Sequence, residues 1–203
     1  MVSESEDFRF ASLEVSRTLD ERFRVQVPSS FCEVLNSTAT IFAVTEGQLY
    51  AQARREAVRA ATQSSEQAEG VVVEVSCTLA KERTGCLSLW DHSAWANKLE
   101  RDMLVIRGKV QSRKLDARFE QVQRLGRLLS TRGTTVDLTF KGTQGARLLI
   151  PKGFREFLGV EPNAPVMIVA SAYSIEIWNP VAWGDYLNST IPEFHKLLDD
   201  LTQ

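Results

Sequence analysis

The sequence predicts an α+β fold that is mainly β and consists of two tandem modules, linked and flanked by helices. Three observations lead to this prediction. A tryptophan-containing phrase occurs twice, a longer pattern of arginine, proline, phenylalanine and leucine repeats in the same order, and helical periodicity is concentrated between the copies. The length of 203 residues is sufficient for two small modules with a buried core.

The tryptophan phrase reads "CLSLWDHSAW" at residues 86–95 and "SIEIWNPVAW" at 174–183, 88 positions later. In the second copy Asn179 is a favourable helix N-cap, and Pro180 suits the first helical position. The flanking tryptophans then occupy the two positions whose side chains pack together as a hydrophobic staple. Asp91 has the capping position in the first copy. Each phrase therefore predicts a strand-to-helix corner held by a tryptophan pair.

The longer repeat aligns "RVQVPSSFCEVL" (24–35) with "RLLIPKGFREFL" (147–158) at a constant offset of 123. The arginine and alternating apolar residues predict a strand, and the proline leads into a two-turn helix that Gly159 ends in the left-handed conformation. Apolar segments near 39–47 and 164–172 follow in the same order and predict further strands. A constant order at a constant offset indicates an internal duplication.

The offset falls from 123 to 88, so the first copy contains about 35 additional residues, placed between about 46 and 84. Within them, 48–62 is rich in helix formers and "VVVEVSCTL" predicts a strand. In the second copy, "APVMIVAS" and "SIEIW" predict a hairpin around Ala172 and Tyr173. Further helices are predicted as an antiparallel pair between the copies and as a last helix near 191–201. The predicted domains are a first module at 8–100 with an insertion at 46–84, a helical linker at 101–132, and a second module at 133–203.

Composition is that of an ordinary globular protein, with 43% hydrophobic and 25% charged residues. Uninterrupted apolar runs are far shorter than the roughly 20 residues that span a bilayer. The acidic, polar start does not have the pattern of a secretory signal. Three cysteines without metal-site spacing (Cys32, Cys77 and Cys86) predict buried, reduced thiols. We therefore expect a cytoplasmic protein with no membrane partner.

Catalysis is not predicted. The stretch "WDHS" (90–93) contains the residue types of a hydrolase triad, but consecutive residues do not converge on one reacting atom. The segment "KGTQGARL" lacks the spacing of a phosphate-binding loop. His92 and His195 are the two histidines, and no metal-ligand cluster is evident. We expect no enzyme activity, no cofactor and no metal site.

Charge is unevenly distributed although the net charge is −2. Residues 101–156 contain thirteen basic and five acidic side chains, a net charge of +8, so the remainder carries −10. Such a field can steer an anionic partner to one face of the protein. Solvated surfaces of the linker helices would give the same distribution.

The doubled arginine, the apolar-x-apolar-Pro strand, "PKGFREFLG" and "IEIWNPVAW" together resemble the MraZ family, which has the fold of the SpoVT–AbrB transition-state regulators. The resemblance covers most of the chain outside the insertion and is most specific in 145–187. It implies two AbrB-like swapped-hairpin β modules folded against each other. It also implies ring-like homo-oligomers that bind double-stranded DNA specifically and regulate transcription near bacterial cell-division and cell-wall genes. The resemblance therefore also implies a cytoplasmic protein that associates with the nucleoid.

Site residues implied by the resemblance surround the Asp-x-x-x-Arg element, which the first copy keeps as Asp20 and Arg24. Phe23 replaces the family's glycine, which predicts that this turn cannot use the same permissive backbone. In the second copy Thr143 replaces the aspartate. We expect Arg24 and Arg147 to bind bases in a major groove, from one exposed turn. The full set of expected DNA-binding residues is Asp20, Arg22, Arg24, Lys141, Arg147, Lys152 and Arg155.

Two alternatives stay open for these residues. The Asp20–Arg24 pair and Arg147 also suit ion pairs that stabilise the barrel, and a carboxylate that orients an arginine serves either purpose. The second functional hypothesis is therefore an oligomeric scaffold or protein-interaction module that kept the fold and lost specific DNA binding. The insertion and the altered Asp-x-x-x-Arg elements favour the scaffold, whereas the basic central region favours DNA binding.

Overall fold

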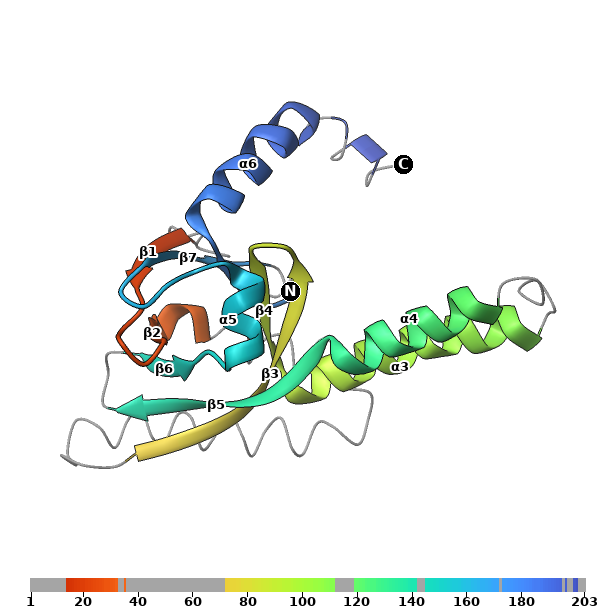
Figure 1. Cartoon of the computed structure of the whole chain (residues 1–203), viewed down its shortest axis with the longest axis horizontal. Coiled ribbons are helices and arrows are strands. Elements are labelled where there is room, and N and C mark those ends of the chain that lie inside the picture. The colour runs from red at the N-terminus through yellow and green to blue at the C-terminus, as the bar shows by residue number, and fades with distance from the viewer. Residues whose placement is uncertain are drawn as a thin grey trace, which may run out of the picture.

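A computed structural model describes residues 14–32, 35, 72–111, 119–141, 145–171, 173–194, 196, 199 and 200. These residues form a mixed α/β structure that is mostly β, in which one antiparallel sheet curls until it is nearly closed (Figure 1). The predicted mainly-β class with flanking helices is confirmed at this level. The predictions for 39–47, for 48–62 and for His195 lie outside the described residues.

The sheet has eight strands in the order β1-β7-β8-β4-β3-β5-β6-β2, and its edge strands β1 and β2 also contact each other. Between the edge strands, pairs of strands from before and after the helix pair are interleaved (β7-β8, β4-β3, β5-β6), so both halves of the sequence build one sheet. The predicted hairpin of β7 and β8 is confirmed. The strands are β1 (Glu14–Thr18), β2 (Arg24–Val27), β3 (Val72–Arg83), β4 (Cys86–Asp91), β5 (Gly133–Lys141), β6 (Ala146–Leu149), β7 (Pro165–Ala170) and β8 (Ile175–Trp178).

Helices α3 (His92–Gln111) and α4 (Phe119–Thr131) form the predicted antiparallel pair, which projects from the sheet as a separate arm (Figure 1). The short α5 (Lys152–Leu158) ends at Gly159 with φ 69°, the predicted left-handed conformation. Helix α6 (Pro180–Thr190) follows β8. The predicted last helix differs at its start. Ile191–Glu193 form a 3-10 turn, because proline at the second position lacks the N–H that an α-helical bond needs.

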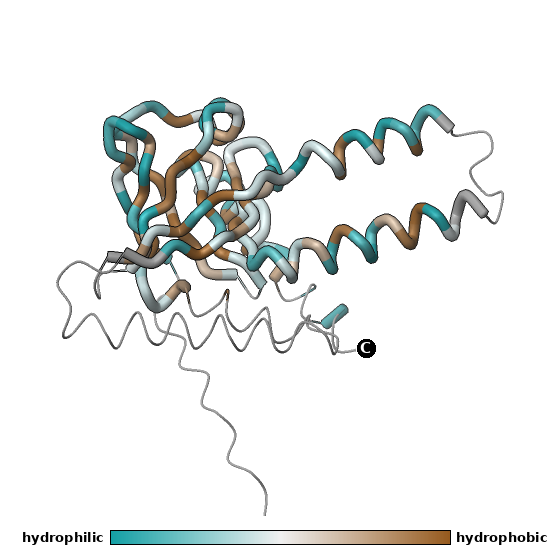
Figure 2. Tube along the Cα trace, turned by 90° about the horizontal axis from the view of Figure 1, so that it is seen from below, coloured by the Kyte–Doolittle hydropathy of each residue, from teal (hydrophilic) through white to brown (hydrophobic). Residues whose placement is uncertain are grey.

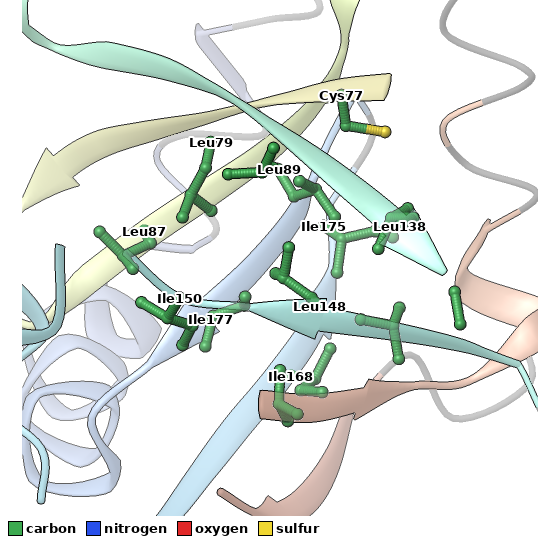
Figure 3. Packing of buried hydrophobic residues seen from close by; sticks show 14 of the residues in the cluster. Cys77, Leu79, Leu87, Leu89, Leu138, Leu148, Ile150, Ile168, Ile175 and Ile177 are labelled. Carbon is green, nitrogen blue, oxygen red and sulfur yellow. The ribbon is translucent and has the colours of Figure 1, made fainter. Parts of the chain in front are cut away.

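The core lies inside the curled sheet, where alternate side chains of neighbouring strands meet (Figure 3). Leu79, Leu89, Leu148 and Ile175 are among its fully buried members. The three cysteines are buried thiols, as predicted. Burial raises the pKa of the Cys86 thiol far above its ordinary value, so this thiol is uncharged and unreactive at neutral pH.

Both predicted tryptophan corners are confirmed. Asn179 Oδ1 accepts a hydrogen bond from the Val181 N–H at 2.9 Å, and the ring centroids of Trp178 and Trp183 lie 5.2 Å apart. In the first corner Asp91 Oδ1 accepts from the two amides of the first helical turn, and the tryptophan centroids lie 5.9 Å apart. These corners set the directions in which α3 and α6 leave the sheet.

Candidate nucleic-acid interface

The turn between β1 and β2 is organised by the carboxylate of Asp20. Its Oδ1 accepts hydrogen bonds from the backbone N–H groups of Arg22 and Arg24, each at 2.9 Å. Its Oδ2 accepts from Arg24 Nε at 2.6 Å. Asp20 thereby fixes both the backbone of the turn and the base of the Arg24 guanidinium. The side chain of Arg22 is exposed.

Phe23 completes this turn in the left-handed conformation, with φ 59°. The expectation that a side chain at this position excludes the glycine-like backbone is therefore wrong. The bonds from Asp20 hold the turn, the Phe23 carbonyl accepts from the Ile150 N–H at 3.0 Å, and the Arg155 guanidinium lies 4.2 Å from the Phe23 ring centroid. These contacts offset the cost of a positive φ in a residue with a Cβ.

Two opposed effects act on the Asp20 carboxyl. Desolvation tends to raise its pKa, but the bonds from the Arg24 N–H, the Arg24 guanidinium and the Arg22 N–H together hold the pKa below its ordinary value. The ionised form is therefore the one that the folded turn favours. Because the folded pKa is depressed, this stabilisation is present at neutral pH and is lost as the pH falls below about 4.

The outward face of β2 and β6 carries the two leading arginines. Arg24 lies opposite Leu149, and Gln26 lies opposite Arg147. Because their sequence neighbours in these strands point into the core, these side chains point outward. Arg24 and Arg147 are thus diagonal neighbours on adjacent strands, with their Cα atoms roughly 7–8 Å apart. The side chain of Arg147 is exposed and makes no hydrogen bond or ion pair in the part of the chain that the structure describes.

Helix α5 brings the last two expected residues beside the β1–β2 turn. Arg155 Nε donates to the Ile150 carbonyl at 2.6 Å, and its guanidinium covers Phe23. Arg155 is therefore engaged in holding α5 against the turn. Lys152, at the start of the helix, is exposed. A hollow of about 520 Å³ lies beside Phe23 and α5, and Glu156 and Glu161 line it together with the two cations.

Lys141 lies apart from the other cations. We expected it on one turn with Arg22, Arg24 and Arg147, but the structure places these residues on separate segments. Lys141 ends β5, and the next strand, β6, pairs with β5 so that Ala146 lies opposite Phe140. The Arg22–Arg24 turn adjoins the other end of β6. The expectation of a shared turn is therefore wrong, because β6 lies between β2 and β5.

Two outward residues of the antiparallel β2–β6 pair, called the β2–β6 ribbon below, are not among the site residues expected from the sequence. Gln26 lies opposite Arg147, and Leu149, which is 49% exposed, lies opposite Arg24. Side-chain amides can bind adenine and apolar groups can contact the thymine methyl group, so both residue types suit a base-reading surface. The alternation of β2 and β6 is the signal that would have identified them.

Acidic residues border this surface. Thr139 of β5 lies opposite Arg147, and Glu74 of β3 lies opposite Thr139. Asp137 lies two residues before Thr139 in β5, on the same outward face, and both acids are exposed. Phosphate would be repelled from β3 and β5, so the β2–β6 ribbon is the part of this face that an anionic polymer can approach.

Comparison of the sequence with models of protein families and with curated protein sequences gives no match. Among the residues described, no group of three or more His, Cys, Asp and Glu side chains is placed to hold a metal ion. No helix within the described ranges is long and apolar enough to cross a bilayer. The functional interpretation therefore depends on the β2–β6 ribbon and the elements around it.

Proposed function

We propose that the protein is a sequence-specific DNA-binding transcriptional regulator of the MraZ type, and that it binds double-stranded DNA through the outward face of β2 and β6. The observation that carries this proposal is the position of Arg24 and Arg147 as diagonal neighbours on the outward face of the antiparallel β2–β6 pair. Laid against a major groove about 12 Å wide, this face would allow each arginine to bind guanine O6 and N7 with two hydrogen bonds.

The register of β2 and β6 supports an internal duplication. At the sequence offset of 123, the repeat equivalent of Arg24 is Arg147, and the repeat equivalent of Leu149 is Gln26. Arg24 lies opposite Leu149, and Arg147 likewise lies opposite Gln26. Val25 and Leu148, which are equivalent in the repeat, lie opposite each other at the centre. A local twofold relation would present the two arginines to DNA in equivalent ways. A short, imperfect palindrome is therefore the expected recognition element.

The register of β4 and β8 has the same property at the second offset, 88. The pair Leu87–Ile177 converts into Ile175–Leu89, and the repeat-equivalent Ser88 and Glu176 lie opposite each other. The β2–β6 pair and the β4–β8 pair thus each have a register that stays the same when every residue is replaced by its repeat equivalent. These two registers support two interleaved AbrB-like swapped-hairpin modules.

The position of β3 changes the proposed limits of the insertion. β3 pairs with β4 as β7 pairs with β8, so β3 is the first-copy counterpart of β7. We had placed the additional residues between about 46 and 84. In the proposed duplication they instead precede Val72, and β3 belongs to the repeated unit.

Assembly would give the DNA contacts their strength. One chain offers two leading arginines, and repetition around a ring-like homo-oligomer would allow spaced DNA elements to be bound together. We propose such a ring acting on repeated operator elements near cell-division and cell-wall genes, in a nucleoid-associated cytoplasmic regulator. The absence of enzyme activity and of a cofactor stays a prediction.

The second candidate is an oligomeric scaffold that kept the fold and lost its DNA target. The contact of Arg24 Nε with Asp20 and the acids on β3 and β5 favour it, because they balance part of the positive charge of the ribbon. In a scaffold, the Asp20–Arg24 pair serves the turn alone. The two candidates therefore differ in what removal of the Asp20 charge does to DNA binding.

The Asp20→Asn variant distinguishes these candidates. The amide oxygen of asparagine can still accept from the Arg22 and Arg24 N–H groups, but its NH₂ group cannot accept from Arg24 Nε. We expect affinity for a specific site to fall about two- to five-fold, which corresponds to the roughly 0.4–1 kcal/mol of an exposed ion pair. Affinity for scrambled DNA should rise, because one negative charge is lost. Fluorescence anisotropy with both DNAs measures the two effects.

An equal rise on both DNAs would favour the scaffold. Calorimetry of the free proteins provides the control for folding. The melting temperatures of wild type and Asp20→Asn should converge as the pH falls below about 4, where the carboxylate of the wild type becomes protonated.

A further inference from the structure

The arm formed by α3 and α4 has an uncovered apolar groove between its helices. The groove measures about 500 Å³, and its apolar lining comes from Val105 and Ile106 of α3 and from Val122, Leu125 and Leu129 of α4. Asp102, Gln121 and Arg132 complete the lining, so one acidic and one basic side chain border it. Val105 is 58% exposed and Leu125 is 44% exposed. Figure 2 shows hydrophobic positions recurring along both helices of the arm, away from the sheet. Two helices that project together leave such side chains in water, and a third helix would cover them.

The arm is also basic. Helices α3 and α4 contain six basic and three acidic side chains, a net charge of +3. Arg101 lies one turn before Val105, and Arg124 lies one turn before Leu128, which is itself 56% exposed. Positive charge therefore flanks the apolar groove on both helices.

The segment from α6 to the last residues has the complementary properties. Residues 180–203 contain four acidic side chains and one lysine, a net charge of −3. Its exposed apolar residues include Ile191 at 64% and Phe194 at 58%. The described acids Asp185, Glu193 and Asp200 are exposed. The same chain thus presents a basic apolar groove on one arm and an acidic apolar helix on another.

Helix α6 is fixed where it leaves the sheet. Trp178, Trp183 and Tyr186 pack on one another, the Arg83 guanidinium lies 4.7 Å from the Tyr186 ring centroid, and Trp183 Nε1 donates to Glu14 Oε1 at 3.0 Å. The two arms project separately from the sheet (Figure 1). These contacts oppose rotation of α6 toward the arm of its own chain.

We propose that the α3–α4 groove binds the acidic α6 segment, residues 180–200, of a second copy of this chain. Two copies of the arm would instead bring two net charges of +3 together, so groove-to-groove contact is disfavoured. The contact is head-to-tail: each chain offers one groove and one α6 segment, and repetition forms a closed ring or an open chain of copies. It specifies the surfaces of the proposed self-association and does not depend on DNA binding.

The test mixes two full-length variants, each defective in one surface. The groove variant carries Val105→Asp and Leu125→Asp, and the tail variant carries Ile191→Asp with Glu193→Lys. All four side chains are exposed, so circular dichroism should show unchanged helicity. In sedimentation velocity without DNA, wild type should form multimers that dissociate as salt rises, and each variant alone should be monomeric. The mixture should form a 1:1 dimer that grows no further, because one intact groove meets one intact tail.

Three outcomes would overturn the proposal: a monomeric wild type, variants that still assemble, or a mixture that stays monomeric. A tail variant that assembles alone would indicate contact between two grooves, and a groove variant that assembles alone would indicate contact between two tails. Arg147→Ala should assemble as wild type does. Loss of DNA binding in that variant with intact assembly therefore separates the two proposals.

Discussion

Gly145→Ala is expected to destabilise the protein by about 3 kcal/mol or more, a large part of the 5–15 kcal/mol that stabilises a typical domain. Gly145 has φ 99°, and a Cβ at this residue would lie 2.3 Å from the Val27 carbonyl oxygen and 2.9 Å from the Ser29 nitrogen. Both are backbone atoms, so no side-chain rotation relieves the overlap. The change would separate β6 from the chain that leaves β2. Urea denaturation measures the loss as a lower midpoint.

Gly153→Ala is the matched control. Gly153 lies in α5, and no atom lies within 4 Å of the position that its Cβ would take. Alanine should therefore raise the free energy of unfolding by about 0.5–1 kcal/mol through its helix propensity. Equal effects of the two changes would contradict the close approach of Gly145 to β2 and the pairing of β2 with β6.

Arg147→Ala is expected to lower affinity for a specific site about 10- to 100-fold, the effect of losing one bidentate contact worth about 1–3 kcal/mol. The melting temperature should not change, because the Arg147 side chain is exposed and makes no hydrogen bond or ion pair within the described ranges. Anisotropy titrations at fixed salt measure the affinity, and calorimetry measures the stability.

Arg127→Ala controls for net charge. Arg127 is an exposed residue of α4, and this helix belongs to the arm that projects from the sheet. Its removal changes the charge of the protein by the same amount as removal of Arg147. If the two variants lose affinity equally, Arg147 acts only through the overall field, and its assignment as a base contact is wrong.

Features that depend on neighbouring residues were predictable from the sequence. The caps at Asp91 and Asn179, the tryptophan staples and the left-handed Gly159 each require only a few adjacent side chains, and the structure has all of them. The β7–β8 hairpin was predictable for the same reason, since a short turn joins two strands of matching alternation.

Features that depend on long-range pairing were not predictable. The interleaved strand order separates Lys141 from Arg24, and nothing local to either residue encodes that order. The left-handed Phe23 depends on contacts from Ile150 and Arg155, more than a hundred residues later. Gln26 gains its place in the site from its register with Arg147. The intrinsic conformational preference of a single residue carries no information about these tertiary contacts.

The most direct test of DNA-specific regulation is a fluorescence anisotropy titration of the wild-type protein. The DNA upstream of its own gene is compared with a scrambled duplex of the same composition, across a salt series. The account predicts tighter binding of the upstream DNA, with a difference that persists at physiological salt. Equal affinities that fall together as salt rises would show attraction to phosphates alone and would contradict the proposed regulator.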